Sequence, residues 1–333
     1  MFLLGGGKKM DTPKFWDIQN SFLSKLLKPF GMLYAFGTAY RIRRAKPYQA
    51  NIPVICVGNL SVGGTGKTPV CLAIAKELYK IKKSFFFLNH GYKSHLKNVM
   101  VDLKTHSAYD VGDEAILLAC YAPTVVDNQR ARGAQLAIRR GAECIIMDDG
   151  FQNPSLIKTF SFVVVDGKKG FGNCCVMPAG PLREPILKGL NRADAIVIAG
   201  KDEWGVSFYL QRHNIDLPVF TGRFKPKAKF LSSLKNKDVL AFAGIGNPKK
   251  FFDLLKENNV NPVKTESYPD HYFYTRFDIE QLQKKANGLP IVTTTKDAVK
   301  IPRDLLKDIH IADGEFVFDN PDEIRNLLKN ITL

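Results

Sequence analysis

Residues 52–70 read Ile-Pro-Val-Ile-Cys-Val-Gly-Asn-Leu-Ser-Val-Gly-Gly-Thr-Gly-Lys-Thr-Pro-Val. An apolar run, a glycine-rich turn and a helical pattern follow one another, which is the order of a phosphate-binding loop. Glycine lets backbone amides approach phosphate oxygens, and the first turn of a helix attracts negative charge. Lys67 would add a positive charge and Thr68 a hydroxyl for Mg²⁺. The predicted nucleotide-binding residues are Ser61, Val62, Gly63, Gly64, Thr65, Gly66, Lys67 and Thr68.

The loop departs from the strict pattern Gly-x-x-x-x-Gly-Lys-[Ser/Thr] at its first position, which is Ser61. Gly63 and Gly64 still supply flexibility, so we expect a changed loop shape rather than a lost phosphate cradle. An ordinary glycine-rich turn with a chance lysine is the alternative. The position between an apolar run and a helical pattern favours the phosphate loop.

Apolar strands alternate with helical patterns on both sides of this loop, across residues 54–199. This alternation predicts an α/β, P-loop NTPase-like fold with a mainly parallel, doubly wound sheet. A second, smaller α/β unit is expected from about residue 224, with a strand at 239–243 and another at 291–295. The predicted regions are an N-terminal segment (1–50), a P-loop core (51–223) and a smaller C-terminal domain (224–333).

The 333-residue chain carries a formal net charge of +16, and its distribution limits the possible partners. Residues 1–50 hold nine Lys/Arg and two Asp, whereas the remaining charge is spread out without an RNA-binding or helix-turn-helix signature. Six cysteines lack the CxxC or Cys/His spacing of a zinc site. We therefore expect no nucleic-acid function, and an anionic lipid surface is the preferred partner.

The N-terminal segment begins with an expected disordered leader at 1–9, and Met10 is a possible alternative start. From residue 15 apolar positions recur at helical spacing, an uncharged run covers 29–40, and a basic cluster follows at 41–46. The run is shorter than the roughly 20 residues that span a bilayer. A basic, aromatic, amphipathic helix in the membrane interface is predicted, and a helix packed on its own domain is the alternative.

Polar residues follow several of the expected strands, at the edge where ligands gather in open α/β sheets. Asp148 and Asp149 end an apolar strand, as the second metal-binding element of a P-loop NTPase does, although alone they would indicate only a turn. Asp113 and Glu114 open a helix, which fits either function or simple charge complementarity. His271 stands in a loop, where a solvated side chain is the alternative to a functional one.

Together these motifs resemble the tetraacyldisaccharide 4'-kinases of lipid A biosynthesis, from about residue 15 to residue 300. The motifs that carry the resemblance are residues 58–69, Gly112-Asp-Glu114, Asp148-Asp-Gly-Phe-Gln152, Pro178-Ala-Gly-Pro-Leu-Arg-Glu184, Ala243-Gly-Ile-Gly-Asn-Pro248, Asp270-His271 and Lys296-Asp-Ala-Val-Lys300. Ser61 is itself similar to this family's version of the loop.

The resemblance implies transfer of the ATP γ-phosphate to the 4'-hydroxyl of tetraacyldisaccharide 1-phosphate, which makes lipid IVA. It implies a peripheral enzyme at the cytoplasmic face of the bacterial inner membrane, with ATP and Mg²⁺ as cofactors. The smaller domain would close over the nucleotide. The lipid disaccharide and an anionic membrane are the expected partners, with no nucleic acid and no obligate protein partner.

The resemblance also implies roles for single residues. Asp113 would be the base that takes the hydroxyl proton, with His271 paired to it, while Lys67 and Arg130 would stabilise phosphate charge. Thr68, Asp148 and Asp149 would form the Mg²⁺ site. Supporting residues would be Glu114, Gln152, Arg183 and Glu184, and possible substrate contacts would be Asn59, His90 and Tyr92.

Two departures from the family pattern affect these expectations. The family's Arg-Gly-Tyr-Gly-Arg turn is here His90-Gly-Tyr-Lys-Ser94, which removes two guanidinium groups, and Thr295 replaces a glutamate. A membrane-associated regulatory ATPase of the partitioning type is the competing interpretation, but that type carries a lysine where this chain has Val62. A nucleic-acid-binding ATPase is a third possibility, and its binding would fall steeply with salt.

Overall fold

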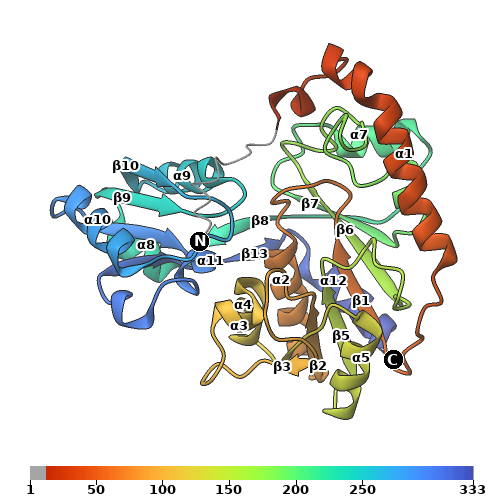
Figure 1. Cartoon of the computed structure of the whole chain (residues 1–333), viewed down its shortest axis with the longest axis horizontal. Helices are drawn as coiled ribbons and strands as arrows, with labels where there is room; N and C mark the ends of the chain where they lie inside the picture. Colours follow the sequence, from red (N-terminus) through yellow and green to blue (C-terminus); the bar gives the residue numbers. More distant parts are fainter. Residues whose placement is uncertain (1–12, 333) are drawn as a thin grey trace, which may run out of the picture.

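The computed structural model describes residues 13–332, so the expected leader and the possible start at Met10 lie outside the described residues. Within them the chain forms a nine-stranded sheet and a separate four-stranded sheet, each covered by helices (Figure 1). The strands of the larger sheet, in spatial order, are β13 (Gly314–Phe318), β8 (Val219–Pro226), β7 (Ala195–Ala199), β6 (Phe160–Asp166), β1 (Val54–Gly58), β5 (Cys144–Asp148), β2 (Phe85–Asn89), β4 (Thr124–Val126) and β3 (Val99–Met100).

The larger sheet is parallel from β8 to β4, and only its edge strands β13 and β3 run antiparallel to their neighbours. Its central strands are uniformly buried, because helices cover both faces. One face packs on α2 (Lys67–Lys80), α4 (Asp113–Ala119) and α12 (Pro321–Thr332). The other packs on α5 (Arg130–Arg139), α6 (Ile186–Leu190) and α7 (Val206–Arg212). This is the predicted doubly wound arrangement.

The smaller sheet has the order β10-β9-β11-β12 and is parallel throughout. Its strands are β9 (Asp238–Ala243), β10 (Asn261–Ser267), β11 (Ile291–Thr294) and β12 (Ile309–Ala312). Its helices are α8 (Ala228–Leu234), α9 (Pro248–Glu257), α10 (Arg276–Ala286), α11 (Thr295–Ala298) and the 3₁₀ turn η2 (Arg303–Leu305). Two apolar clusters, one on each face, give this unit a core of its own.

The predicted division at residue 223/224 differs from the sheet membership. β8 crosses that boundary, and β13 with α12, at 314–332, returns to the larger sheet although both were assigned to the smaller domain. β8 and β13 form an antiparallel ribbon that connects the two units (Figure 1). The two strands lie almost a hundred positions apart in the chain, and local periodicity contains no information about such a pairing.

Helix α1 (Phe22–Arg44) follows a short 3₁₀ turn, η1 (Lys14–Asp17), so the predicted helix begins later than residue 15. It lies along the side of the larger unit away from the smaller one (Figure 1). The residues that α1 buries are small or polar: Ser24, Gly31 and Thr38. A Cβ at Gly31 would lie 2.8 Å from the Val176 carbonyl oxygen, so the close approach requires glycine there.

The large apolar side chains of α1 are therefore exposed. They include Phe22, Leu26, Phe30, Met32, Leu33 and Phe36, each between 61% and 78% exposed. A contiguous apolar surface of this kind marks a site of interaction with another molecule or a membrane. No helix within residues 13–332 is long and apolar enough to cross a bilayer.

Candidate active site

The phosphate loop connects β1 to α2, as predicted. Gly66 caps α2 with a positive φ of 91°, and Lys67 is the first helical residue. The preceding part of the loop is held by the segment after Gly180: the Val62 amide donates to the Pro181 carbonyl (2.8 Å), and Ser61 forms a β-bridge with Leu182. The serine in place of the first glycine is thus accommodated in an extended strand-like position.

The Asn59 side chain stabilises this loop through hydrogen bonds to other loop residues. The side chain is buried, and Nδ2 donates to the Ser61 carbonyl (2.6 Å) and to Thr65 Oγ1 (3.0 Å). Gln152 Nε2 donates to the Asn59 carbonyl (2.8 Å) and to Glu184 Oε1 (3.1 Å). The loop uses the Nδ2 group of Asn59, and the expected contact of Asn59 with substrate stays a prediction. Gln152 and Glu184 lie where supporting residues were predicted.

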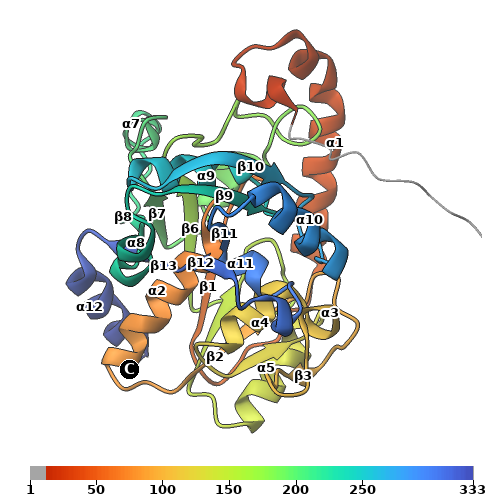
Figure 2. The same ribbon diagram turned by 90° about the vertical axis from the view of Figure 1, so that its left-hand side faces the viewer.

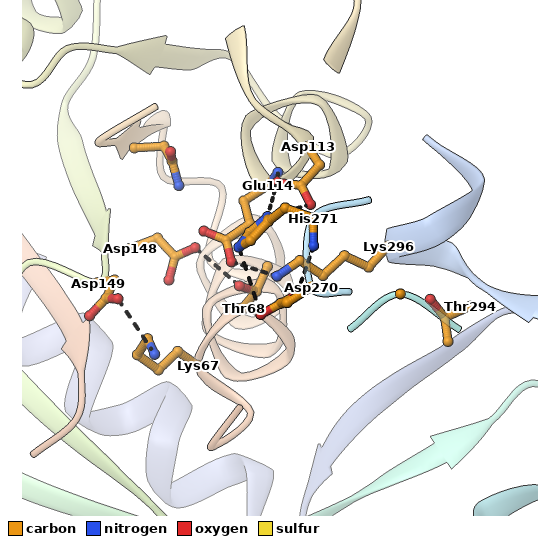
Figure 3. Close-up of polar contacts among 12 residues, drawn as sticks. Lys67, Thr68, Asp113, Glu114, Asp148, Asp149, Asp270, His271, Thr294 and Lys296 are labelled. Atoms are coloured by element: carbon orange, nitrogen blue, oxygen red, sulfur yellow. Dashed lines mark hydrogen bonds and ion pairs between the residues drawn. The ribbon is translucent and has the colours of Figure 1, made fainter. Parts of the chain in front are cut away.

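Two carboxylates meet the phosphate loop at the carboxyl end of β5. Thr68 Oγ1 donates to Asp148 Oδ2 at 3.2 Å. Asp149 accepts two hydrogen bonds from the Arg183 guanidinium (3.0 and 3.3 Å), and the Lys67 ammonium lies 3.5 Å from its Oδ2 (Figure 3). The predicted metal residues and the predicted loop lysine are thus within contact distance of one another.

The two carboxylates differ in their electrostatics. Burial raises the pKa of Asp148 to about 7, and the nearby charges of Glu114 and Asp149 act in the same direction. Burial also acts to raise the pKa of Asp149, but the Lys67 and Arg183 charges outweigh it and lower that pKa below its usual range. Asp148 is therefore a buried carboxylate that a bound cation would stabilise.

These groups fit a magnesium site completed by the nucleotide. Mg²⁺ keeps several waters and is commonly held by one or two protein oxygens together with substrate phosphates. Thr68 Oγ1 and Asp148 provide such oxygens beside the phosphate loop. Among residues 13–332 no group of three or more His, Cys, Asp or Glu side chains is arranged to hold a metal alone.

The Arg130 guanidinium contacts backbone carbonyls, and its predicted contact with phosphate stays a prediction. The side chain is 1% exposed, and its guanidinium donates to the carbonyls of Leu88 (3.1 Å), Asp148 (2.9 Å) and Asp149 (3.4 Å). These carbonyls lie at the ends of two neighbouring strands, β2 and β5. Arg130 therefore positions the turn that carries the two carboxylates.

The predicted base and its partner meet between the two units. His271 Nδ1 lies 2.8 and 3.0 Å from the two carboxylate oxygens of Asp113, although the residues are 158 positions apart (Figure 3). Asp113 begins α4 after Gly112, whose φ is 95°. His271 is therefore more than a solvated loop side chain, and Asp113 does more than complement the charge of a helix end.

Burial alone would raise the pKa of Asp113, but the hydrogen bond from His271 and the charge of Lys296 outweigh it, with a smaller effect of Lys300. The resulting pKa is about 2. The Lys300 ammonium lies 3.9 Å from Asp113 Oδ2. The carboxylate thus stays ionised and acts as a strong hydrogen-bond acceptor.

The turn after β2 contributes two of the predicted contact residues. The Tyr92 ring is exposed, and its centroid lies 5.1 Å from that of His271. His90 lies nearer the Asp148–Asp149 turn; burial and the charge of Arg130 lower its pKa. Tyr92 therefore belongs to the surface around the Asp113–His271 pair.

Two cationic residues near the pair had no predicted role. Lys296 forms an ion pair with Glu114 (2.9 Å), and Lys300 is fully buried beside Asp113. The sequence signal was present, because both belong to the Lys296-Asp-Ala-Val-Lys300 motif. A further ion pair joins the two units, between Lys250 and Asp166 (2.6 Å). Asp166 is the last residue of β6 in the larger sheet.

Comparison with known proteins decides the family. The family profile described as Tetraacyldisaccharide-1-P 4'-kinase matches residues 23–332. The chain belongs to this family. The match confirms the resemblance seen in the sequence motifs and spans both units, including the C-terminal segment that returns to the larger sheet.

Individual members of the family agree with this assignment. The tetraacyldisaccharide 4'-kinase of Paramagnetospirillum magneticum is 44% identical over 97% of this chain and 99% of its own length, and that of Rhodospirillum rubrum is 41% identical over 97% and 98%. The crystal structure of LpxK from Aquifex aeolicus in complex with ATP has a TM-score of 0.74 and 27% identity, covering 94% of this chain and all of that one. The fold class predicted from the sequence is thereby confirmed.

Proposed function

We propose that this chain transfers the γ-phosphate of ATP to the 4'-hydroxyl of tetraacyldisaccharide 1-phosphate, the reaction of its family. The observation that carries the proposal is the contact of Asp113 with His271, which forms between the two units beside a phosphate loop. A phosphate donor and a proton acceptor are thus available within one site. Phosphoryl transfer depends mainly on placing such groups correctly.

The phosphates of ATP would bind to the amides of residues 63–68 that are not used within the loop and to the first turn of α2. Lys67, whose ammonium lies 3.5 Å from Asp149, would contact the phosphate oxygens, while Arg183 keeps Asp149 in place. Arg130 holds the backbone beneath. The phosphate charge is then stabilised by groups that need little rearrangement.

Magnesium would be held by Thr68 and Asp148 together with phosphate oxygens. When bound, it neutralises charge on the transferring phosphate. Asp149 would support the site without holding the ion directly, because the Arg183 guanidinium satisfies its carboxylate. Glu114 lies close enough to Asp148 to raise that residue's pKa, and it would help to attract the cation.

The hydroxyl proton passes to Asp113. A carboxylate with a pKa of about 2 holds a proton only briefly. His271 Nδ1 is hydrogen-bonded to both carboxylate oxygens and orients the carboxylate toward the hydroxyl. Loss of the proton to solvent after each transfer regenerates the Asp113 base. Tyr92 would line the adjacent surface on which the sugar rests.

The lipid substrate requires the enzyme to work at a membrane, since each exposed CH₂ costs about 0.8 kcal/mol. The exposed apolar side chains of α1 provide an interfacial contact, and Arg41, Arg43 and Arg44 at its end suit anionic lipid. We place the enzyme peripherally on the cytoplasmic face of the inner membrane, where ATP is available.

A transfer assay tests this function. Purified protein is incubated with Mg²⁺, γ-labelled ATP and tetraacyldisaccharide 1-phosphate in detergent micelles, with Lys67→Ala as control. Label in the lipid fraction only with intact Lys67 is the expected result. Hydrolysis of ATP without labelled lipid would refute the proposal and favour a regulatory ATPase.

A further inference from the structure

The Lys296–Lys300 motif has no role in the mechanism above, yet it lies against the catalytic pair. Lys296 lies in α11 (Thr295–Ala298), and Lys300 follows in the turn just after that helix. Lys300 Nζ lies 3.9 Å from Asp113 Oδ2, and Lys296 Nζ lies 2.9 Å from Glu114 Oε1. The two carboxylates belong to the first turn of α4 in the larger unit, while both lysines belong to the smaller one.

Asp297, between the two lysines, ties together the turns of the smaller unit that face the site. It is fully buried and accepts hydrogen bonds from the Gly244 amide (2.9 Å) and the Tyr274 hydroxyl (3.0 Å). It also pairs with Lys300 at 3.0 Å, and Lys300 donates to the Gly244 carbonyl (2.8 Å). The turn that carries His271 leads directly into Tyr274. His271 and Lys296 are therefore parts of one rigid surface.

The ion pair of Lys296 with Glu114 spans the two units next to the Asp113–His271 contact (Figure 3). Both side chains are mostly shielded, with 25% and 26% exposure. Such a pair is less screened by solvent than an exposed one. Since Glu114 directly follows Asp113 in α4, fixing one carboxylate against the smaller unit also fixes the other.

We infer that Lys296 is a positioning residue that clamps the smaller unit onto Glu114 and thereby keeps His271 on Asp113. The inference rests on the proposed kinase function for its catalytic readout. Its structural part, a clamp between two units, does not depend on the identity of the acceptor.

Three variants test the clamp. Lys296→Gln removes the charge, Lys296→Arg keeps it, and Lys285→Gln is the matched control. Lys285 pairs with Glu266 (2.8 Å) within the smaller unit. For Lys296→Gln we expect kcat to fall about tenfold to about hundredfold, because small displacements of catalytic groups have effects of this size. The KM for ATP should change less than about threefold. Lys296→Arg should restore most of kcat, and Lys285→Gln should match the wild type.

Small-angle scattering in the presence of Mg²⁺ and a non-hydrolysable ATP analogue measures the arrangement of the units. We expect a larger radius of gyration for Lys296→Gln and for Glu114→Gln, and no further increase in the double variant, since both remove one contact. Thermal melting identifies any variant that is merely unfolded. A wild-type radius or a wild-type kcat in folded Lys296→Gln overturns the inference.

The experiments distinguish failure of the proposed function from failure of the Lys296 clamp. If the wild-type protein labels no lipid, the proposed function fails, and the scattering comparison still decides whether Lys296 clamps the units. If the wild type labels lipid and Lys296→Gln does so equally well, only the clamp is lost.

Discussion

Helices α1 and α12 both lie on the outside of the larger unit, but they bury opposite kinds of residue (Figures 1 and 2). α12 packs on α2 through Ile324 and Leu328, which are both 0% exposed. α1 packs through Ser24, Gly31 and Thr38 and leaves its phenylalanines in solvent. Burial of apolar surface stabilises a fold. The exposed side chains of α1 therefore contribute little to folding, which fits their proposed contact with a membrane.

The same contrast exists inside the molecule, at the end of β5. Arg130 is buried and donates to three carbonyls, although its Nε has no partner among the described residues, so it serves the fold. Asp148 is equally buried but has a pKa raised to about 7, so its ionised form costs stability. Groups that cost stability concentrate at functional sites. Arg130 thus stabilises the fold, whereas Asp148 is a residue that a bound cation would stabilise.

The outer face of α1 gives the largest expected effect. In the triple variant Phe22→Ser, Phe30→Ser, Phe36→Ser, each lost contact is worth about 1.5–3 kcal/mol, so affinity for anionic vesicles should fall at least about thousandfold. The melting temperature should be unchanged, because these side chains are 61–78% exposed. Vesicle flotation and thermal melting measure the two effects.

The matched control replaces three exposed aromatics elsewhere, Tyr79, Phe208 and Phe277, with serine. This control should bind vesicles as the wild type does. Equal loss in both triple variants would remove the special role of α1.

The buried face of α12 should respond in the opposite way. Leu328→Ala leaves a cavity and should lower the free energy of unfolding by about 2–5 kcal/mol, with vesicle affinity unchanged. Urea denaturation measures this effect, and Asn330→Ala on the exposed side of α12 is the control. A Leu328→Ala protein of wild-type stability would mean that α12 is not part of the core.

Arg130→Met should cost about 1–3 kcal/mol, since buried carbonyls lose their donor. The measurement is again urea denaturation, compared with Arg139→Met at the exposed end of α5. If instead ATP affinity falls and stability does not, Arg130 reaches the phosphates after all.

Asp148→Asn should give the smallest effect on stability, and a favourable one. The raised pKa means that the folded protein holds a proton that the unfolded chain releases, so stability falls as pH rises from the ordinary aspartate range to about 7. In chelator at pH 8 we expect the variant to melt about 2 °C higher, with the gain decreasing below pH 7 and vanishing near pH 4.

Asp149→Asn serves as the control of opposite sign. The pKa of Asp149 is lowered by Lys67 and Arg183, so its ionised form stabilises the protein above its unfolded pKa. This variant should melt lower than the wild type at pH 8. Stabilisation by both substitutions would contradict the difference drawn between the two carboxylates.

Sequence patterns predicted best those parts of the site whose residues are neighbours in the chain. The phosphate loop and the strand-end position of Asp148 follow from an apolar run and a glycine turn, which neighbouring residues determine. The buried course of Arg130 and the inward amide of Asn59 depend on strands that come together only in the fold. The β8–β13 ribbon was missed for the same reason. The resemblance implied that His271 pairs with Asp113, but no motif indicated that Lys296 and Glu114 meet beside that pair.

The turnover of Asp113→Asn tests the central claim most directly. Lipid labelling and ATP binding are measured in parallel on the wild type and the variant, with Mg²⁺ present. Loss of a general base lowers turnover by about 10²–10⁴-fold, and ATP affinity should stay within about threefold because Asp113 lies outside the phosphate loop. Turnover near that of the wild type would contradict the assignment of Asp113 as the proton acceptor.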